Sequence, residues 1–371
     1  MAAPGTAPIH VSLEGISSGT PTEDLLALVL KANPSVSDII FSPGRNFQVH
    51  AHGELLSLVI PGFPPFTADD TRRIASDLIG SNKAAINLLR EHGFCDISYA
   101  LPGVARFRVN VFIQRGSCAV VMRVIPTVIP DFQTLALPSQ LKEIAELHDG
   151  MVLIAGPRGC GKSSTLAALL DQMNESVMRH IITIEDPIEF LHNHKRSTIH
   201  QCELHSDTPS IPEAMCAVLR QAPNVIAIGE LKDPETMELA LQASETGHLV
   251  LSTVNAVNAQ QTIERFTGSF PAEEHRFIRS RLARVLRYVV SQRLVPKKDD
   301  AGRSPVFEVL KSGSDALTHL LNNDSHHQNG DFAIDSQIED LVRAGIVSRE
   351  VAMAHAIDAR ALAQRLATTE K

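Results

Sequence analysis

Short apolar runs separated by turn residues dominate the first third of the chain. The segments 37–60 and 105–126 alternate between apolar and polar positions, a pattern typical of half-buried strands. The second segment changes direction at Arg115-Gly116, as a hairpin does. Three stretches around these strands predict helices instead: 22–33, 67–80 and 82–92. Residues 21–126 are therefore predicted to form a small α+β domain.

The segments on either side of this domain have a different character. Residues 1–20 are small and polar, with Gly and Pro throughout, and we expect a flexible N-terminus. Residues 127–138 are interrupted by prolines, which indicates a linker.

From residue 139 the apolar runs become nearly continuous and are separated by helical segments. These runs cover 151–156, 180–185, 224–230 and 248–253. Such an alternation predicts an α/β domain whose parallel sheet is covered by helices on both faces. Beyond residue 272 the pattern becomes helical, so we expect the core to extend over 139–300 and a helical C-terminal region over 301–371.

Composition narrows the class of protein. With 371 residues, two domains are expected. The chain has 34 basic and 42 acidic residues, a net charge of −8, which argues against a dedicated nucleic-acid-binding protein. The five scattered cysteines form no C-x-x-C pair, so neither a disulfide framework nor a zinc site is predicted. No signal peptide or long apolar run is visible, and we expect a soluble, cytoplasmic protein.

The sequence GPRGCGKS, from Gly156 to Ser163, matches the phosphate-binding P-loop pattern. Glycines let backbone N–H groups curl around phosphates, and the following helix points its positive dipole end at them. Lys162 is expected to reach the β- and γ-phosphates, and the Ser163 hydroxyl to ligate Mg²⁺. The residues predicted to bind ATP here are Gly156, Gly159, Gly161, Lys162, Ser163 and Ser164.

Acidic residues follow two of the predicted strands. Glu185 and Asp186 end one apolar run, and Glu230 ends another. Because ligands bind at the carboxyl ends of parallel strands, these acids are candidates for orienting Mg²⁺ or polarising a water molecule. A single acid after a strand could equally be a solvated loop residue, but two after a P-loop favour a hydrolytic site.

A longer series of motifs resembles one family. The stretches IITIEDPIEF, VIAIGELKDPETMELALQASETGHLVLST, QTIERF and FPAEE occur in this order. They resemble the secretion-type ATPases of type IV pili, above all the retraction (PilT-like) branch of the type II/IV secretion ATPases. The resemblance covers the chain from about residue 21, and it implies a RecA-like P-loop core with a PAS-like N-terminal domain. The tetracysteine insert expected of assembly and type II secretion ATPases is missing, which favours the retraction branch.

The resemblance also implies roles for individual residues. IEDPIEF corresponds to an Asp box in which Glu185 activates water and Asp186 supports it. IGE corresponds to an atypical Walker B motif in which Gly229 replaces the first acid and Glu230 organises Mg²⁺. His248, in the first half of a His box, is a candidate γ-phosphate sensor or subunit-coupling residue.

Three arginines of the N-terminal hairpin, Arg106, Arg108 and Arg123, resemble arginines that reach a neighbouring subunit's nucleotide in a hexameric ring. A solvated strand face is the alternative for them.

Several positions depart from the family pattern. Asn255 stands where a second His-box histidine is expected, and it can hydrogen-bond but cannot take a proton. Cys202 replaces an arginine between Gln201 and Glu203, and Ala222 and Asn224 replace two acids. The stretch 316–323 only partly resembles a segment that the family links to retraction.

A basic segment, 276–298, holds eight basic residues and no acid. Its apolar positions, Ile278, Leu282, Val285, Leu286 and Val289, predict one helical stripe with most arginines on the other side. Two interpretations are open, a solvated helix face and a docking surface for an acidic partner or a neighbouring subunit.

These observations favour a hexameric, Mg²⁺-dependent ATPase that drives type IV pilus retraction. The resemblance places it at the cytoplasmic side of the inner membrane, with the pilus platform protein, the pilin machinery and possibly a paralogous ATPase as partners. The alternative is an accessory paralogue that binds ATP, turns over slowly and modulates a partner motor. A nucleic-acid translocase fits the net charge poorly.

Overall fold

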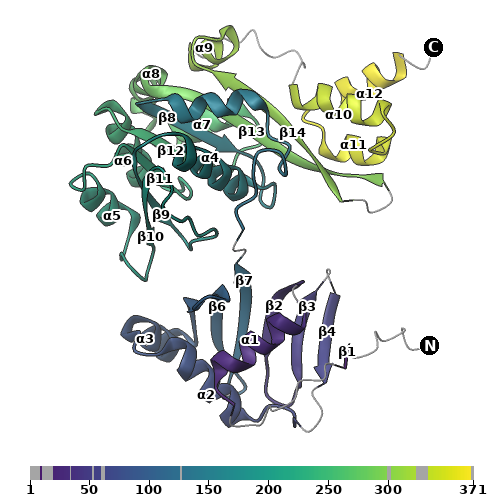
Figure 1. The fold of residues 1–371 in the computed structure, drawn as a ribbon. Coiled ribbons are helices and arrows are strands. Elements are labelled where there is room, and N and C mark those ends of the chain that lie inside the picture. Colours follow the sequence, from purple (N-terminus) through teal and green to yellow (C-terminus); the bar gives the residue numbers. More distant parts are fainter. Residues whose placement is uncertain are drawn as a thin grey trace. The chain divides into compact units, whose positions relative to one another are not determined.

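The chain folds into two compact units, Met1–Thr127 and Val128–Lys371 (Figure 1). The computed structural model describes residues 9–10, 20–33, 35–51, 54–59, 63–125, 128–298, 302–322 and 333–368. Most of the segment 1–20, predicted to be flexible, lies outside these residues. In the part predicted to be a linker, residues 128–138 contain turns but neither helix nor strand.

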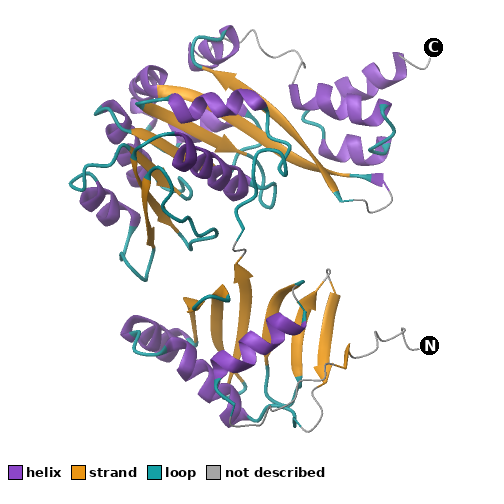
Figure 2. Ribbon diagram, in the orientation of Figure 1, coloured by secondary structure: helices purple, strands orange, loops and turns teal. Residues whose placement is uncertain are grey.

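The N-terminal unit is one sheet covered on one face by three helices (Figure 2). The strand order is β1-β4-β3-β2-β7-β6-β5. The predicted hairpin is confirmed, because β6 and β7 pair antiparallel and Arg115 and Gly116 at the turn both have positive φ. The elements are β1 (Ile9–His10), α1 (Thr22–Ala32), β2 (Val36–Phe41), β3 (Phe47–Ala51), β4 (Glu54–Val59), α2 (Ala68–Ile79), α3 (Lys83–His92), β5 (Phe94–Leu101), β6 (Ala105–Gln114) and β7 (Ser117–Ile125).

The alternating pattern of β6 fixes which face of this sheet is buried. Phe107, Val109 and Val111 are fully buried in the same core as Leu26 of α1 and Ile74 of α2. A capping box starts α2, since the Thr67 hydroxyl accepts a hydrogen bond from the Asp70 N–H at 3.1 Å. The shared core holds α1 and α2 on one face of the sheet, and the cap fixes where α2 begins.

The second unit contains a sheet with the strand order β10-β9-β11-β12-β8-β13-β14, parallel except for β14. Along β8, Met151 and Leu153 pack into one core while Val152 and Ile154 pack into another. Both faces of the sheet are thus covered, as predicted. The elements up to β12 are η1 (Ser139–Glu146), β8 (Gly150–Ala155), α4 (Lys162–Ser176), β9 (His180–Glu185), β10 (Thr198–Glu203), α5 (Ile211–Val218), β11 (Val225–Ile228), α6 (Pro234–Glu245) and β12 (Leu249–Val254).

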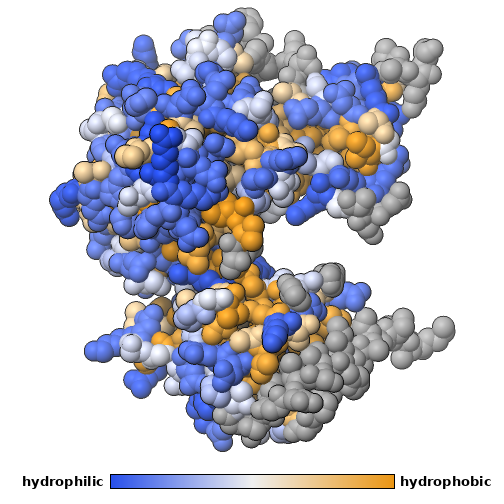
Figure 3. All heavy atoms as spheres, viewed as in Figure 1, coloured by the Kyte–Doolittle hydropathy of each residue, from blue (hydrophilic) through white to orange (hydrophobic). Residues whose placement is uncertain are grey.

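Helices η1 and α4 cover one face of this sheet, and α5 to α8 cover the other. Figure 3 shows mainly hydrophilic residues over α5 and α6, as expected for helices whose apolar sides face the sheet. Within the described residues, no helix has both the length and the apolar character needed to cross a membrane.

The helical prediction after residue 272 is only partly correct. Ile278, Leu282 and Val285 form the buried stripe of α8, but the chain then becomes a strand, β13. Val289 packs on one face of the sheet while Tyr288 and Val290 pack on the other, which is the two-residue period of a strand. The four-residue spacing from Val285 to Val289 fits both periods, so this stripe could not distinguish them.

The region 301–371 is also not wholly helical. It begins with the strand β14, which pairs antiparallel with β13, and only then becomes helical. A third core in this unit joins Val295 of β13 and Val306 of β14 to the last helices. The elements are α7 (Ala259–Gly268), η2 (Ala272–Glu274), α8 (His275–Val285), β13 (Leu286–Pro296), β14 (Arg303–Lys311), α9 (Asp315–Asn322), α10 (Ala333–Arg343), α11 (Arg349–His355) and α12 (Ala359–Thr368).

Several arginines of the basic segment 276–298 serve the fold. Arg281 is buried on α8 and forms ion pairs with Glu238 at 2.9 Å and Glu245 at 2.8 Å, both on α6. Arg287 pairs with Asp149. Two of the eight basic residues are thus engaged in ion pairs that serve the fold, and both interpretations of the segment stay predictions.

Replacing Arg281 should destabilise the second unit, because Glu238 loses its ion pair and Glu245 keeps only the longer contact to the exposed Arg284. We expect Arg281→Met to lower the free energy of unfolding by about 1.5–3 kcal/mol, the range for hydrogen bonds to charged groups. The control is Arg284→Met, since Arg284 contacts the same Glu245 at 3.5 Å but its side chain is 69% exposed, and its loss should cost less than about 1 kcal/mol. Urea unfolding followed by circular dichroism measures both, and equal effects would contradict the prediction.

Candidate active site

The P-loop connects β8 to α4. β8 is completely buried, and α4 begins at Lys162. Gly156 has φ +155°, and a Cβ at this position would lie 2.4 Å from Cys160 Sγ and 2.5 Å from the Gln292 carbonyl oxygen. The next two glycines, Gly159 and Gly161, adopt left-handed backbone conformations. The loop is therefore a tight turn that requires glycine at these positions.

Gln292 of β13 supports this loop from behind. Its side-chain amide donates to the Cys160 carbonyl at 2.7 Å and accepts a hydrogen bond from the Thr165 hydroxyl at 2.8 Å. The side chain is buried, so both bonds are shielded from water. Gln292 was not identified from the sequence, because the segment that contains it was predicted to be helical.

Lys162 lies at the centre of the site. Its Nζ donates to the carbonyl oxygens of Gly156 at 2.8 Å and Pro157 at 3.0 Å, and to Asn255 Oδ1 at 2.7 Å. Burial lowers the pKa of Lys162, while the nearby Glu230 acts in the opposite direction. The lysine is thus held at the mouth of the loop by neutral oxygens.

Asn255 joins the lysine to the second motif. Its amide nitrogen donates to Glu230 Oε1, while its amide oxygen accepts from Lys162. Glu230 follows β11 and Asn255 follows β12, and these adjacent strands are parallel. The residue that departs from the family pattern therefore forms a neutral bridge between two residues of opposite charge.

Glu185, at the end of β9, is held by two side-chain donors. Glu185 Oε1 accepts from the Thr183 hydroxyl at 2.7 Å and from the Gln201 amide at 3.0 Å. Burial raises the pKa of Glu185, although both hydrogen bonds favour the ionised form. Gln201 lies next to Cys202, so the motif still positions Glu185 despite that departure.

Glu189 is a further residue of the site that the sequence analysis did not single out. It accepts a hydrogen bond from the Ser163 hydroxyl at 2.9 Å. Glu189 lies in the motif IEDPIEF, four residues after Glu185, and this position could have identified it as a candidate site residue. A carboxylate therefore faces the predicted Mg²⁺ ligand.

Asp186 is exposed and lies 3.5 Å from Lys232 Nζ, which is also 3.7 Å from Glu230. Lys232, which was likewise not predicted, thus connects the two acidic motifs across the surface of the site. Its side chain is 54% exposed, and such a pair contributes little to stability.

His248 does not lie near the phosphate-binding loop of its own chain. It precedes β12, whereas Asn255 follows this strand. The six residues of β12 separate them by about 20 Å. The predicted role of His248, as a γ-phosphate sensor or a subunit-coupling residue, stays a prediction. The His248 ring contacts the Ala243 carbonyl at 3.0 Å.

The three arginines of the N-terminal unit lie on β6 and β7. Arg108 and Arg123 are directly opposite each other in the strand pair and are exposed, while Arg106 is half-buried. Arg123 also donates to Asp38 at 2.9 Å. Both interpretations, a solvated strand face and a contact to a neighbouring subunit, remain predictions.

The donor set of the site suits magnesium bound together with a nucleotide. No group of three or more His, Cys, Asp or Glu side chains in the described residues is arranged to hold a metal by itself. Mg²⁺ usually keeps several waters and binds through few protein oxygens plus substrate phosphates. Ser163 and Glu230 fit this requirement, the second through water.

The fold and the loop define this chain as a P-loop nucleotide-binding protein with a parallel α/β core. Residues 97–364 match the family model described as type II/IV secretion system protein. The chain therefore belongs to the type II/IV secretion system protein family, which confirms the resemblance seen in the sequence.

Three similar proteins show how far the likeness extends. A protein named Twitching motility protein from Neisseria gonorrhoeae is 38% identical over 82% of this chain and 83% of its own length. The Type IV pilus retractation ATPase PilT of Pseudomonas aeruginosa is 36% identical over 87% and 95%. A crystal structure of the pilus retraction motor PilT with bound ADP superposes with a TM-score of 0.83 at 36% identity, covering 92% of this chain and 99% of the other. The predicted fold class is thereby confirmed.

A methyl group at Gly156 should weaken nucleotide binding. We expect Gly156→Ala to raise the Kd for ADP by about 5- to 150-fold, because overpacking of a tight site costs about 1–3 kcal/mol. The matched control is Gly268→Ala at the end of α7, where an added Cβ meets no atom within 4 Å. Titration with a fluorescent ADP analogue measures both, and an unchanged Kd for Gly156→Ala would contradict this account of the loop.

Proposed function

We propose that this protein is a Mg²⁺-dependent ATPase that works as a homohexameric motor and drives retraction of type IV pili. The observation that carries the proposal is the chain of contacts from Lys162 through Asn255 to Glu230. It brings the P-loop and the Walker B acid together at one edge of the sheet. The similarity to a pilus retraction ATPase over most of both chains supports retraction, rather than assembly, as the process that the motor drives.

The residues of the site have distinct roles in this proposal. Backbone N–H groups of the P-loop and Lys162 bind the phosphates of ATP, and Lys162 exchanges Asn255 for a γ-phosphate oxygen. Glu185 accepts the proton of the attacking water, with Asp186 beside it. Magnesium, when bound, neutralises phosphate charge, and Ser163 and Glu230 hold it, Glu230 through water.

The surroundings of the motor follow from the same family. We infer that the ring acts peripherally at the cytoplasmic side of the inner membrane, against the pilus platform protein and the pilin machinery, with a paralogous ATPase as a further candidate partner. His248 and the arginines Arg106, Arg108 and Arg123 are assigned to coupling between subunits. No direct contact with nucleic acid is expected.

ATP hydrolysis should depend on Glu230, the acidic residue at the end of the chain of contacts from Lys162 through Asn255. We expect Glu230→Gln to lower kcat about 100-fold, since the amide cannot supply the negative charge that orients the metal-bound water. Asn255→Leu should lower kcat about tenfold, because a hydrogen bond to a charged group contributes about 1.5–3 kcal/mol. Gln260→Leu is the control, as Gln260 is exposed and, among the described residues, its side chain bonds only Glu264, at 2.9 Å.

Steady-state ATP hydrolysis by the purified ring measures these rates. If the wild type is no faster than Glu230→Gln, the motor is not supported and the chain is an accessory ATP-binding paralogue. If Asn255→His strongly raises turnover, the histidine expected at this position limits a motor that is otherwise intact.

The fall in ATPase activity at low pH (the acidic limb of the pH profile) should reflect the protonation of Glu185. Its pKa is raised by burial, and the base must be ionised, so activity falls as the pH drops through this raised value. Thr183→Val removes one donor to the carboxylate and should move the limb upward by about one pH unit. Thr198→Val, at an exposed position of β10, is the control. An unshifted limb in Thr183→Val would argue against Glu185 as the base.

A further inference from the structure

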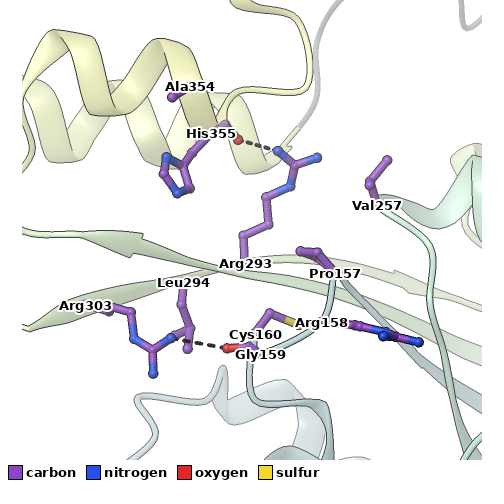
Figure 4. Close-up of a pocket in the computed structure, with 10 residues that line it drawn as sticks. All are labelled: Pro157, Arg158, Gly159, Cys160, Val257, Arg293, Leu294, Arg303, Ala354 and His355. Atoms are coloured by element: carbon purple, nitrogen blue, oxygen red, sulfur yellow. Dashed lines mark hydrogen bonds between the residues drawn. The ribbon is translucent and has the colours of Figure 1, made fainter. Parts of the chain in front are cut away.

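Helix α4 is held at its two ends by different parts of the chain. At the P-loop end, Arg303 donates to the Gly159 carbonyl at 3.2 Å, beside a cavity of ≈ 300 Å³ (Figure 4). At the other end, the helix contacts the connection between β9 and β10, residues 186–197, which carries Asp186 and Glu189. This connection contains neither helix nor strand, so its position depends on the contacts that its backbone makes with other elements.

Asn174, in the last turn of α4, binds this connection through its side chain and its backbone. Its Nδ2 donates to the Asn193 carbonyl at 2.7 Å, and its Oδ1 accepts from the Lys195 N–H at 3.1 Å. Its carbonyl is one of those that the end of a helix leaves without an intrahelical partner. This carbonyl accepts from the N–H groups of Arg196 and Ser197 at 2.8 and 3.1 Å. One residue of α4 thus holds much of the connection.

The side chain of Asn174 is fully buried, although asparagine is a weak helix former. A buried amide costs free energy unless its polar atoms are hydrogen-bonded, and here both are. Lys195 and Glu175 form an ion pair nearby at 2.6 Å, but the Glu175 side chain is 58% exposed, and such a pair contributes little. Asn174 is therefore the buried anchor of the connection on α4.

Gln201 on β10 links this connection to Glu185. Its Oε1 accepts from the His192 N–H at 2.9 Å, and its Nε2 donates to the Phe190 carbonyl at 2.8 Å. The same Nε2 donates to Glu185 Oε1 at 3.0 Å, which uses the second N–H of the amide. Two backbone groups of the connection therefore fix the plane of the Gln201 amide, and with it the direction from which Glu185 is bound.

These contacts form a continuous path from α4 to the proposed catalytic base. Asn174 binds the backbone at Asn193. The preceding residue of the connection binds Gln201, which in turn binds Glu185. From Lys162 to Asn174 the helix extends about 18 Å. Asn174 is thus remote from the phosphate-binding loop, and the path through the connection is how it reaches the site.

We propose that Asn174 is a positioning residue for ATP hydrolysis. It fixes the connection on α4, and the connection orients Gln201 and thereby the carboxylate of Glu185. This inference rests on the proposed function, in which Glu185 accepts the proton of the attacking water. The helix that begins at the P-loop therefore also determines, through its last turn, where the base lies.

Asn174→Ala should lower kcat about tenfold or more, because a displacement of about 1 Å in a catalytic group can cost about 100-fold. The Kd for ADP should stay unchanged, since the P-loop lies at the other end of α4. Burial raises the pKa of Glu185 and the hydrogen bond from Gln201 lowers it, so weakening that bond should move the acidic limb to higher pH. Steady-state hydrolysis across the pH range and titration with a fluorescent ADP analogue measure these effects.

Glu175→Gln is the matched control, because Glu175 adjoins Asn174 on α4 and contacts the same connection from an exposed position. It should leave kcat and the acidic limb unchanged. A double variant separates positioning from a purely structural role. If Asn174 acts through Gln201, Asn174→Ala should add little to the effect of Gln201→Met, whereas two effects that multiply would contradict the proposal.

Hydrogen–deuterium exchange of the purified protein without nucleotide gives a readout that needs no turnover. The His192 N–H, which donates to Gln201, should exchange faster in Asn174→Ala and at the wild-type rate in Glu175→Gln. Asn174→Asp keeps the acceptor for the Lys195 N–H and loses the donor to Asn193, and it takes the place of Asn174→Ala if that variant does not fold.

The two measurements distinguish this inference from the proposed function. If the wild type hydrolyses ATP and Asn174→Ala keeps the same kcat and acidic limb, the inference is wrong and the proposed function stands. A wild type without turnover contradicts the proposed function instead. The exchange result then decides whether Asn174 positions Gln201: faster exchange at His192 in Asn174→Ala supports it, and unchanged exchange overturns it.

Discussion

The parallel alignment of β8, β9, β11 and β12 is the constraint on which the site depends. Because these strands run in one direction, the P-loop, Glu185, Glu230 and Asn255 all emerge at one edge of the sheet. The cores on both faces fix the strands, so the side chains at this edge need little further support. Lys162, Asn255 and Glu230 then form contacts across three strands that no local segment could form alone.

Sequence reasoning succeeded where the information is local. The P-loop glycines and the acids after the strands are recognisable from their immediate neighbours, and the same holds for the hairpin at Arg115-Gly116. Gln292 lies 127 residues from Thr165, its hydrogen-bond partner, and only the pairing of β13 with β8 brings them together. His248 precedes β12, whereas Glu230 and Asn255 follow their strands, and its predicted role stays a prediction.

The amide of Asn255 also gives a physical meaning to the departure from the family pattern. An amide donates and accepts at once and does not titrate, so the bridge between Lys162 and Glu230 is the same at all physiological pH values. A histidine at this position would become a double donor when protonated and would then repel the lysine. With Asn255, the site has at this position a group whose charge does not change with pH, in place of a histidine that can be protonated.

The strand pair β13–β14 contacts two parts of the second unit, the P-loop and the C-terminal helices. At one point Gln292 and Arg303 contact the P-loop, and farther along Gln337 of α10 receives a hydrogen bond from the Phe307 N–H at 3.0 Å. Val295 and Val306 are buried among the C-terminal helices. Backbone pairing of β13 with β14 thus links the strand residues at the P-loop to those that pack against the C-terminal helices. The two strands, in regions predicted to be helical, therefore place the P-loop and the helices α10–α12 on one continuous piece of the sheet.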